Sequence, residues 1–159
     1  MIGLIEYNWQ VRDEWLDWCE MLSTEQLYAE QTGGAGSILY TLFHIVEVEN
    51  SWLRAVQNKQ DVPYIFEDYS SLDEVKALSN TLRKEHALFL RTDLDAVLNQ
   101  YVQVSWDNQI YQAKDILHHL IIHEVHHIGQ LSIWARQMNK QPIESHYVGR
   151  QLKRVEEYI

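Results

Sequence analysis

Apolar residues recur every three or four positions in four segments of the chain, the spacing that gathers them on one face of an α-helix. In the first segment, Leu4, Val11 and Trp15 fall in one such stripe. The four predicted helices span residues 3–22, 37–57, 72–92 and 113–139. Helices of similar length, each with one apolar face, favour an all-α fold built as a four-helix bundle.

Capping residues and helix breakers mark several ends of these helices. Three glycines within residues 33–36 close a connector over residues 23–36, and Ser37 is a suitable N-cap for the second helix. Residues 58–70 form a predicted loop, after which Ser71 and Glu74 make a capping box for the third helix. Pro142 lies beyond the end of the fourth.

Two shorter elements complete the pattern. Between residues 101 and 111, Val102, Val104 and Trp106 alternate with polar residues, which predicts a short β-hairpin inserted before the last long helix. A short amphipathic helix is expected over residues 148–158. The 159 residues match the usual size of one domain, so residues 1–159 are predicted to fold as a single unit.

Composition and charge narrow the class of protein. Apolar residues make up 46% of the chain, yet no apolar run reaches the ~20 residues that a membrane-spanning helix needs. The first residues lack a basic stretch typical of a signal peptide, so a cytoplasmic location is expected. The lone Cys19 lies on the apolar stripe and is expected to be a small buried residue. A formal charge of −10 with scattered basic residues argues against nucleic acid as a partner.

The last long predicted helix contains the main candidates for metal ligands, because it holds five of the eight histidines. His123 and His127 are four residues apart, so their imidazoles point the same way from the apolar stripe. Burying two unpartnered imidazoles costs ~1–3 kcal/mol for each polar group, and a divalent metal gives both a partner. His119 and His126 flank this pair, and His118 points away into solvent. We therefore predict that His123 and His127 provide two of the ligands of a metal site.

A third ligand must come from elsewhere, since a catalytic zinc usually has three protein ligands and an open position. His44 is favoured because it shares a polar face of the second helix with Glu47 and Ser51. Gln130 could hydrogen-bond an imidazole and fix its tautomer, and Gly129 is expected to allow close approach of a neighbouring helix. The candidates for the third ligand are His44, His86, His146, Glu47, Glu124 and Glu144.

Residues 123–127 also satisfy the His-Glu-x-x-His pattern of zinc proteases, in which the glutamate is the general base. Glu144 could then serve as the third ligand. The five-residue match is weak, and Glu124 lies ~100° around the helix from His123, where a helix-surface acid is the simpler expectation.

The histidine pattern resembles the DinB family. It is carried by His44 within Ser37–His44, followed by Glu49 and Trp52, and by His119-x-x-x-His123-x-x-x-His127-x-Gly129-Gln130. The resemblance covers nearly the whole chain and departs at Ile128, where the family commonly has arginine. It implies a four-helix bundle, often dimeric, with one divalent metal ion, zinc or nickel, bound by His44, His123 and His127.

Two classes of function fit these residues. The resemblance implies a metal-dependent enzyme acting on a small molecule, since the wider superfamily includes a maleylpyruvate isomerase and transferases that use bacillithiol, mycothiol or glutathione. A thiol cosubstrate and a small electrophile are then expected. The residues expected to support the metal ligands or to line the pocket are Glu47, His119, His126 and Gln130. The alternatives are a non-catalytic metal-binding or stress-response protein, or a metal-dependent hydrolase.

Overall fold

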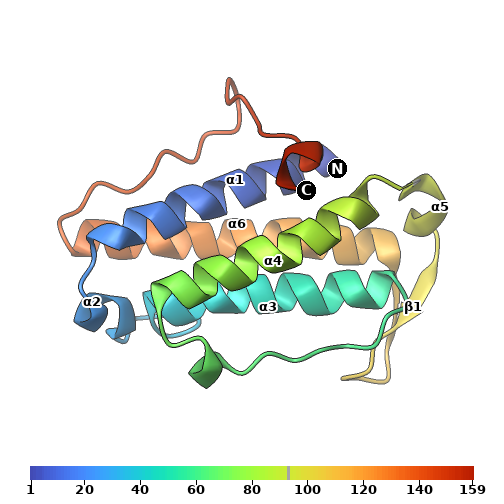
Figure 1. The fold of residues 1–159 in the computed structure, drawn as a ribbon, viewed down its shortest axis with the longest axis horizontal. Coiled ribbons are helices and arrows are strands. Elements are labelled where there is room, and N and C mark those ends of the chain that lie inside the picture. Colours follow the sequence, from blue (N-terminus) through green and yellow to red (C-terminus); the bar gives the residue numbers. More distant parts are fainter. Residues whose placement is uncertain (93) are drawn as a thin grey trace.

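The computed structural model describes residues 1–92 and 94–159. Four long helices lie side by side and account for the predicted all-α fold (Figure 1). They are α1 (Ile2–Trp18), α3 (Ile38–Val56), α4 (Leu72–Leu90) and α6 (Ala113–Gln137). The first and last of these, α1 and α6, run in one direction, and α3 and α4 run in the other.

The predicted caps are confirmed and explain where two of these helices begin. The Ser37 side chain accepts a hydrogen bond from the backbone N–H of Tyr40 at 3.1 Å. Ser71 and Glu74 form the expected capping box, with the Ser71 N–H donating to Glu74 Oε2 at 2.9 Å. Each cap satisfies backbone N–H groups that a helix leaves without partners at its first turn.

The short elements lie at the ends of the bundle. The hairpin is confirmed: β1 (Tyr101–Gln103) pairs antiparallel with β2 (Ile110–Gln112), with Val102 opposite Tyr111. The helix α5 (Leu94–Leu98) precedes it, and α2 (Thr24–Tyr28) follows the 3₁₀ turn Cys19–Met21 at the opposite end. The prediction missed α2, which begins at a capping box formed by Ser23 and Gln26.

The predicted helix over residues 148–158 is wrong. Only the 3₁₀ turn Val155–Tyr158 forms there, and the chain before it crosses α1 without regular structure. Contacts with α1 replace helical hydrogen bonds: the Val155 N–H donates to Glu6 Oε1 at 3.1 Å, and Tyr7 Oη donates to the Ser145 carbonyl at 2.6 Å. Tertiary contacts therefore outweigh the local amphipathic pattern.

A long connection runs from α3 back along the bundle to the start of α4, and it includes the 3₁₀ turn Phe66–Asp68. It is held against α3 by aromatic contacts. The Phe66 ring lies 5.0 Å from that of Tyr40 and 5.3 Å from that of Phe43, between ring centroids. This connection places its acidic residue Asp61 beside the polar face of α3.

The core combines large aromatic residues with buried charge. Trp9, Trp15 and Trp134 are buried, as is Cys19, in agreement with the sequence prediction. Leu4, predicted on the core stripe, is instead exposed. Within the described part of the chain, no helix is both long and apolar enough to cross a membrane.

Candidate metal centre

Two facing helices bring three histidines together. His44 lies near the middle of α3, and His123 and His127 lie one turn apart near the middle of α6. Their nearest ring nitrogens, one from each residue, all lie within 4.8 Å of one another. Among the described residues, this is the set of histidine, cysteine and acidic side chains whose geometry could hold a metal ion.

The distances within this cluster match those expected between ligands of one cation. His123 Nε2 lies 3.1 Å from His44 Nε2 and 3.2 Å from His127 Nε2. Tetrahedral coordination with zinc–nitrogen bonds near 2.0–2.1 Å would place ligand nitrogens about 3.3 Å apart. Two of the three separations are therefore close to those between zinc ligands, and all three nitrogens lie within 4.8 Å of one another.

Hydrogen bonding alone does not account for this convergence. A neutral imidazole nitrogen carries either one proton or one lone pair. His127 Nδ1 lies 2.7 Å from Gln130 Oε1, and because an amide oxygen only accepts, the His127 proton is assigned to Nδ1. Its Nε2 then presents a lone pair to His123. One proton on His123 would have to serve two neighbours, whereas a cation accepts all three lone pairs at once.

Gln130 hydrogen-bonds two histidines of α6. While its Oε1 accepts from His127, its Nε2 donates to His126 Nε2 at 2.9 Å. A residue that fixes the tautomer of a ligating histidine typically matters to metal affinity. Gly34 lies directly against this residue, because a Cβ added there would meet Gln130 Oε1 at 2.8 Å and the Trp134 ring at 2.7 Å.

The electrostatic environment keeps the three imidazoles neutral. Burial, together with the neighbouring histidines, lowers the pKa of His123 to about 3. Burial also lowers the pKa of His44 and of His127, although in His127 the hydrogen bond with Gln130 opposes the shift. Neutral imidazole is the form that binds a metal, so the site needs little proton release near neutral pH.

Aromatic rings and one carboxyl group border the cluster. The Tyr40 ring stacks on that of His44, with ring centroids 6.2 Å apart and planes at 17°. His119 is exposed, and its ring lies 5.7 Å from that of His123. Glu47 follows His44 by about one turn and is half-buried. Burial and then the nearby Asp61 carboxylate raise the pKa of Glu47, and the neighbouring Ser51 side chain opposes this shift.

Glu124 is not the surface acid that the sequence suggested. It is 3% exposed, and both of its oxygens accept from Arg12, from Nε at 2.8 Å and Nη2 at 2.7 Å. The same guanidinium binds Glu49 of α3, with Nη2 to Oε2 at 2.7 Å. This pairing turns Glu124 away from His123 and His127. Sequence reasoning missed Arg12, although its place beside Val11 on the apolar stripe of α1 was an available indication.

The remaining ligand candidates lie elsewhere. Glu144 is exposed and contacts His146 Nδ1 at 2.8 Å, so neither joins the cluster. His86 is fully buried in α4 without a hydrogen-bond partner. With Glu124 held by Arg12 and Glu144 remote, the geometry does not support the zinc-protease pattern. As expected, His118 is exposed.

The expected role of Gly129 is also wrong. A Cβ added at this position would meet nothing within 4 Å, so no neighbouring helix requires a glycine there. The close approach that the sequence placed at Gly129 occurs instead at Gly34, which has a φ of +72°.

The fold and the site together define a class: helical bundles with a three-histidine cluster of the kind that could bind a divalent metal. The family model described as the DinB family matches residues 2–154, and the chain belongs to the DinB family. It is also similar to the uncharacterized protein YizA of Bacillus subtilis (strain 168). The two are 48% identical over 159 residues, which cover 99% of this chain and 100% of the relative.

Proposed function

We propose that this DinB-family protein is a divalent-metal-dependent enzyme that transfers a small thiol to an electrophilic carbon. His44, His123 and His127 are the proposed ligands, and zinc or nickel the proposed metal. The observation that carries the proposal is the convergence of three Nε2 atoms, with the His127 tautomer set by Gln130. Membership of the DinB family supports the same assignment.

The donor set suits thiol chemistry. Three neutral imidazoles leave the full charge of a divalent cation available, which lowers the pKa of a thiol or water bound at the open side. The thiolate sulfur then forms a bond to carbon, and the leaving group departs with its electron pair. Glu47 is the proposed acceptor of the thiol proton, because it lies on the His44 face of α3 and burial raises its pKa.

A non-catalytic metal-binding protein is the second candidate. One observation favours it: His126 Nε2 already accepts from Gln130, so this nitrogen is not available as a base. Turnover of a thiol and an electrophile distinguishes the enzyme from the non-catalytic metal-binding protein.

The test is transfer of low-molecular-weight thiols to a chromogenic aryl halide by zinc- or nickel-loaded protein. The proposal predicts turnover that chelation abolishes and that metal restores. The His44→Ala variant should lose this activity, and Glu47→Gln should lower kcat while metal content stays at the wild-type level. The matched control is His118→Ala, which removes an exposed histidine of α6. Full metal occupancy without turnover of any thiol would favour the non-catalytic candidate.

A further inference from the structure

A small cavity lies along the face of α3 that carries His44, beginning at Glu47. Its volume is about 240 Å³, and it lies between α3, the long connection after α3, and the tip of the hairpin. Its lining consists of Glu47, Val48, Ser51, Trp52, Asp61 and Trp106. The four α3 residues continue the helix face that carries His44 toward the C-terminal end of the helix. The cavity is therefore a continuation of the candidate site.

Two indole rings give this cavity aromatic sides. The Trp52 and Trp106 rings meet edge to face, with centroids 4.9 Å apart and planes at 88°. Tyr111 of the hairpin holds Trp52 from another side, at 5.4 Å between centroids. Indole is the aromatic side chain that attracts cations most strongly, because its face carries the negative part of a quadrupole.

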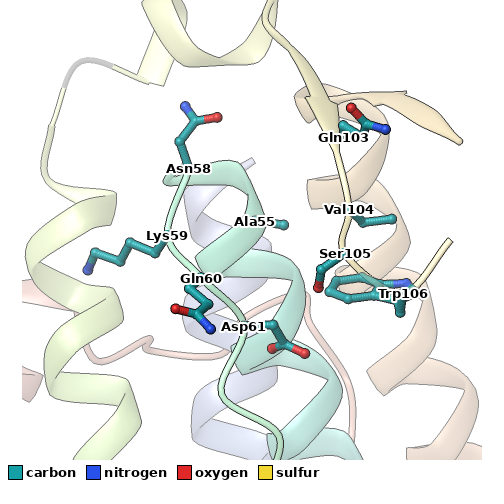
Figure 2. A pocket seen from close by; sticks show the side chains of 9 residues that line it. All are labelled: Ala55, Asn58, Lys59, Gln60, Asp61, Gln103, Val104, Ser105 and Trp106. Carbon is teal, nitrogen blue, oxygen red and sulfur yellow. The ribbon is translucent and has the colours of Figure 1, made fainter. Parts of the chain in front are cut away.

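The charged groups facing the cavity are both acidic. Glu47 and Asp61 come from different segments, and Asp61 Oδ1 is buried without a hydrogen-bond donor. No lysine or arginine is among the residues that line the cavity. A neighbouring cavity of about 250 Å³ shares Asp61 and Trp106 and includes Lys59 in its lining (Figure 2). That lysine is turned toward α4, where its Nζ contacts Glu85 Oε1 at 2.8 Å (Figure 2).

We propose that this cavity binds an organic ammonium group of the substrate or cosubstrate. Two carboxylates supply opposite charge, and two indoles supply faces that favour an alkylated ammonium over a strongly hydrated metal ion. An inorganic cation would need several oxygen ligands around one point. In the described chain, the group of ligand atoms close enough for that purpose is the histidine cluster, and it contains neither carboxylate.

The cavity is connected to the histidines by a row of rings. Trp52 lies 5.6 Å from His119, and His119 lies 5.7 Å from His123, between ring centroids. A molecule whose ammonium group lies against the indoles and the two carboxylates could therefore extend past His119 toward the histidine cluster. As a substrate subsite, this assignment rests on the proposed function, and it names the class of molecule: small amines carrying a reactive thiol or electrophilic group.

Binding can be tested without any reaction. Choline is titrated against 3,3-dimethylbutan-1-ol, its neutral carbon isostere, at constant ionic strength, and the indole N–H resonances of Trp52 and Trp106 are followed by NMR. We expect choline to bind at least tenfold more tightly than the isostere. The double variant Glu47→Gln/Asp61→Asn should reduce choline affinity to that of the isostere, while Glu25→Gln, an exposed acid at the opposite end of the bundle, should leave it unchanged.

Equal affinities for choline and its isostere, full affinity in the double variant, or no shift of either indole resonance would overturn the assignment. If the double variant fails to fold, the comparison of the two ligands on the wild type decides alone. The titrations use metal-free and metal-loaded protein. Choline binding in a protein that takes up no metal would overturn the proposed function and leave the ammonium site standing.

Discussion

At the residue scale, Gln130 has the most direct influence on the histidine cluster without belonging to it. Its amide oxygen fixes the proton of His127 on Nδ1, and its amide nitrogen holds His126. If a metal is bound by His127 Nε2, the lone pair that it uses is available because of this hydrogen bond.

The Gln130→Leu variant is therefore expected to bind zinc about 10–100-fold more weakly than wild type, the usual cost of losing such a partner. Competition with a chromogenic chelator measures the affinity. Gln137→Leu, which removes an exposed glutamine of the same helix, is the matched control. Wild-type affinity in Gln130→Leu would contradict the role given to this hydrogen bond.

His86 makes the folded state sensitive to acid. Burial lowers the pKa of His86, and the nearby Glu49 carboxylate only partly opposes this shift. In the unfolded chain its pKa returns to about 6.5, so below that pH the unfolded state binds more protons. Stability is thus lost as the pH falls from about 6.5 toward the lowered pKa of the folded state.

We expect His86→Leu to remove about 1 kcal/mol of the stability difference between pH 7.5 and pH 5.5, as one proton linked to unfolding would contribute. Urea unfolding of the metal-free protein at both pH values measures this difference. His118→Gln, at an exposed position of α6, should retain the wild-type dependence. An unchanged pH dependence in His86→Leu would show that other groups cause it.

At the element scale, the glycine connector between α2 and α3 contacts the residues that support the histidine cluster. Gly34 has a φ of +72° and no room for a Cβ between Gln130 and Trp134. Gly33 has a nearly equal φ of +76° but open space around it. The two positions therefore separate backbone strain from contact with the site.

Both Gly33→Ala and Gly34→Ala should lose about 1–2 kcal/mol of unfolding free energy from the left-handed backbone. Only Gly34→Ala should also weaken zinc binding, because its methyl group displaces Gln130. Unfolding curves and zinc competition on the two variants test this. Equal zinc affinities in both would mean that the connector has no influence on the cluster.

A buried ion network joins three helices of the bundle. Arg12 of α1 binds Glu49 of α3 and Glu124 of α6, and Trp9 Nε1 also donates to Glu49 Oε2 at 2.8 Å. Burial would raise the pKa of Glu49, but the Arg12 guanidinium outweighs it and lowers that pKa. Removing the arginine would leave two buried carboxylates without their cation.

Arg12→Met is expected to cost about 3–5 kcal/mol of unfolding free energy, the usual penalty for an unpaired buried charge. Thermal and urea unfolding measure the loss, with Arg136→Met, an exposed arginine of α6, as the control. Further replacement of both carboxylates, in Arg12→Met/Glu49→Gln/Glu124→Gln, should recover part of it. A loss no larger than that of Arg136→Met would contradict the pairing.

The elements that the sequence predicted well are those whose determinants are local. Apolar spacing and the caps at Ser37 and Ser71 place α3 and α4 within two residues of their observed ends. The expected helix near the C-terminus failed because contacts with α1 decide that segment. The prediction that Glu124 is a surface acid failed for a similar reason, because only the packing of α6 against α1 brings Glu124 to Arg12.

At the scale of the whole molecule, the long connection after α3 explains the arrangement of the site. It lets α3 and α4 run in parallel (Figure 1). It also places Asp61 in the same cavity as Glu47 of α3. The histidine cluster joins α3 to α6. His123 and His127 could be chosen from sequence because i, i+4 spacing is local, and His44 from its polar helix face and the family resemblance. The neighbouring cavity could not, because it needs Trp106 of the hairpin to pack against α3 and Asp61.

The most direct test of this account is the metal content of wild-type protein and His44→Ala after identical loading with zinc or nickel, measured by elemental analysis. His44 is the proposed ligand from α3, so the cluster cannot keep three imidazoles without it. The account predicts about one equivalent per chain in wild type and the loss of most of it in His44→Ala. Wild-type protein that takes up no metal, or His44→Ala that retains a full equivalent, would contradict it.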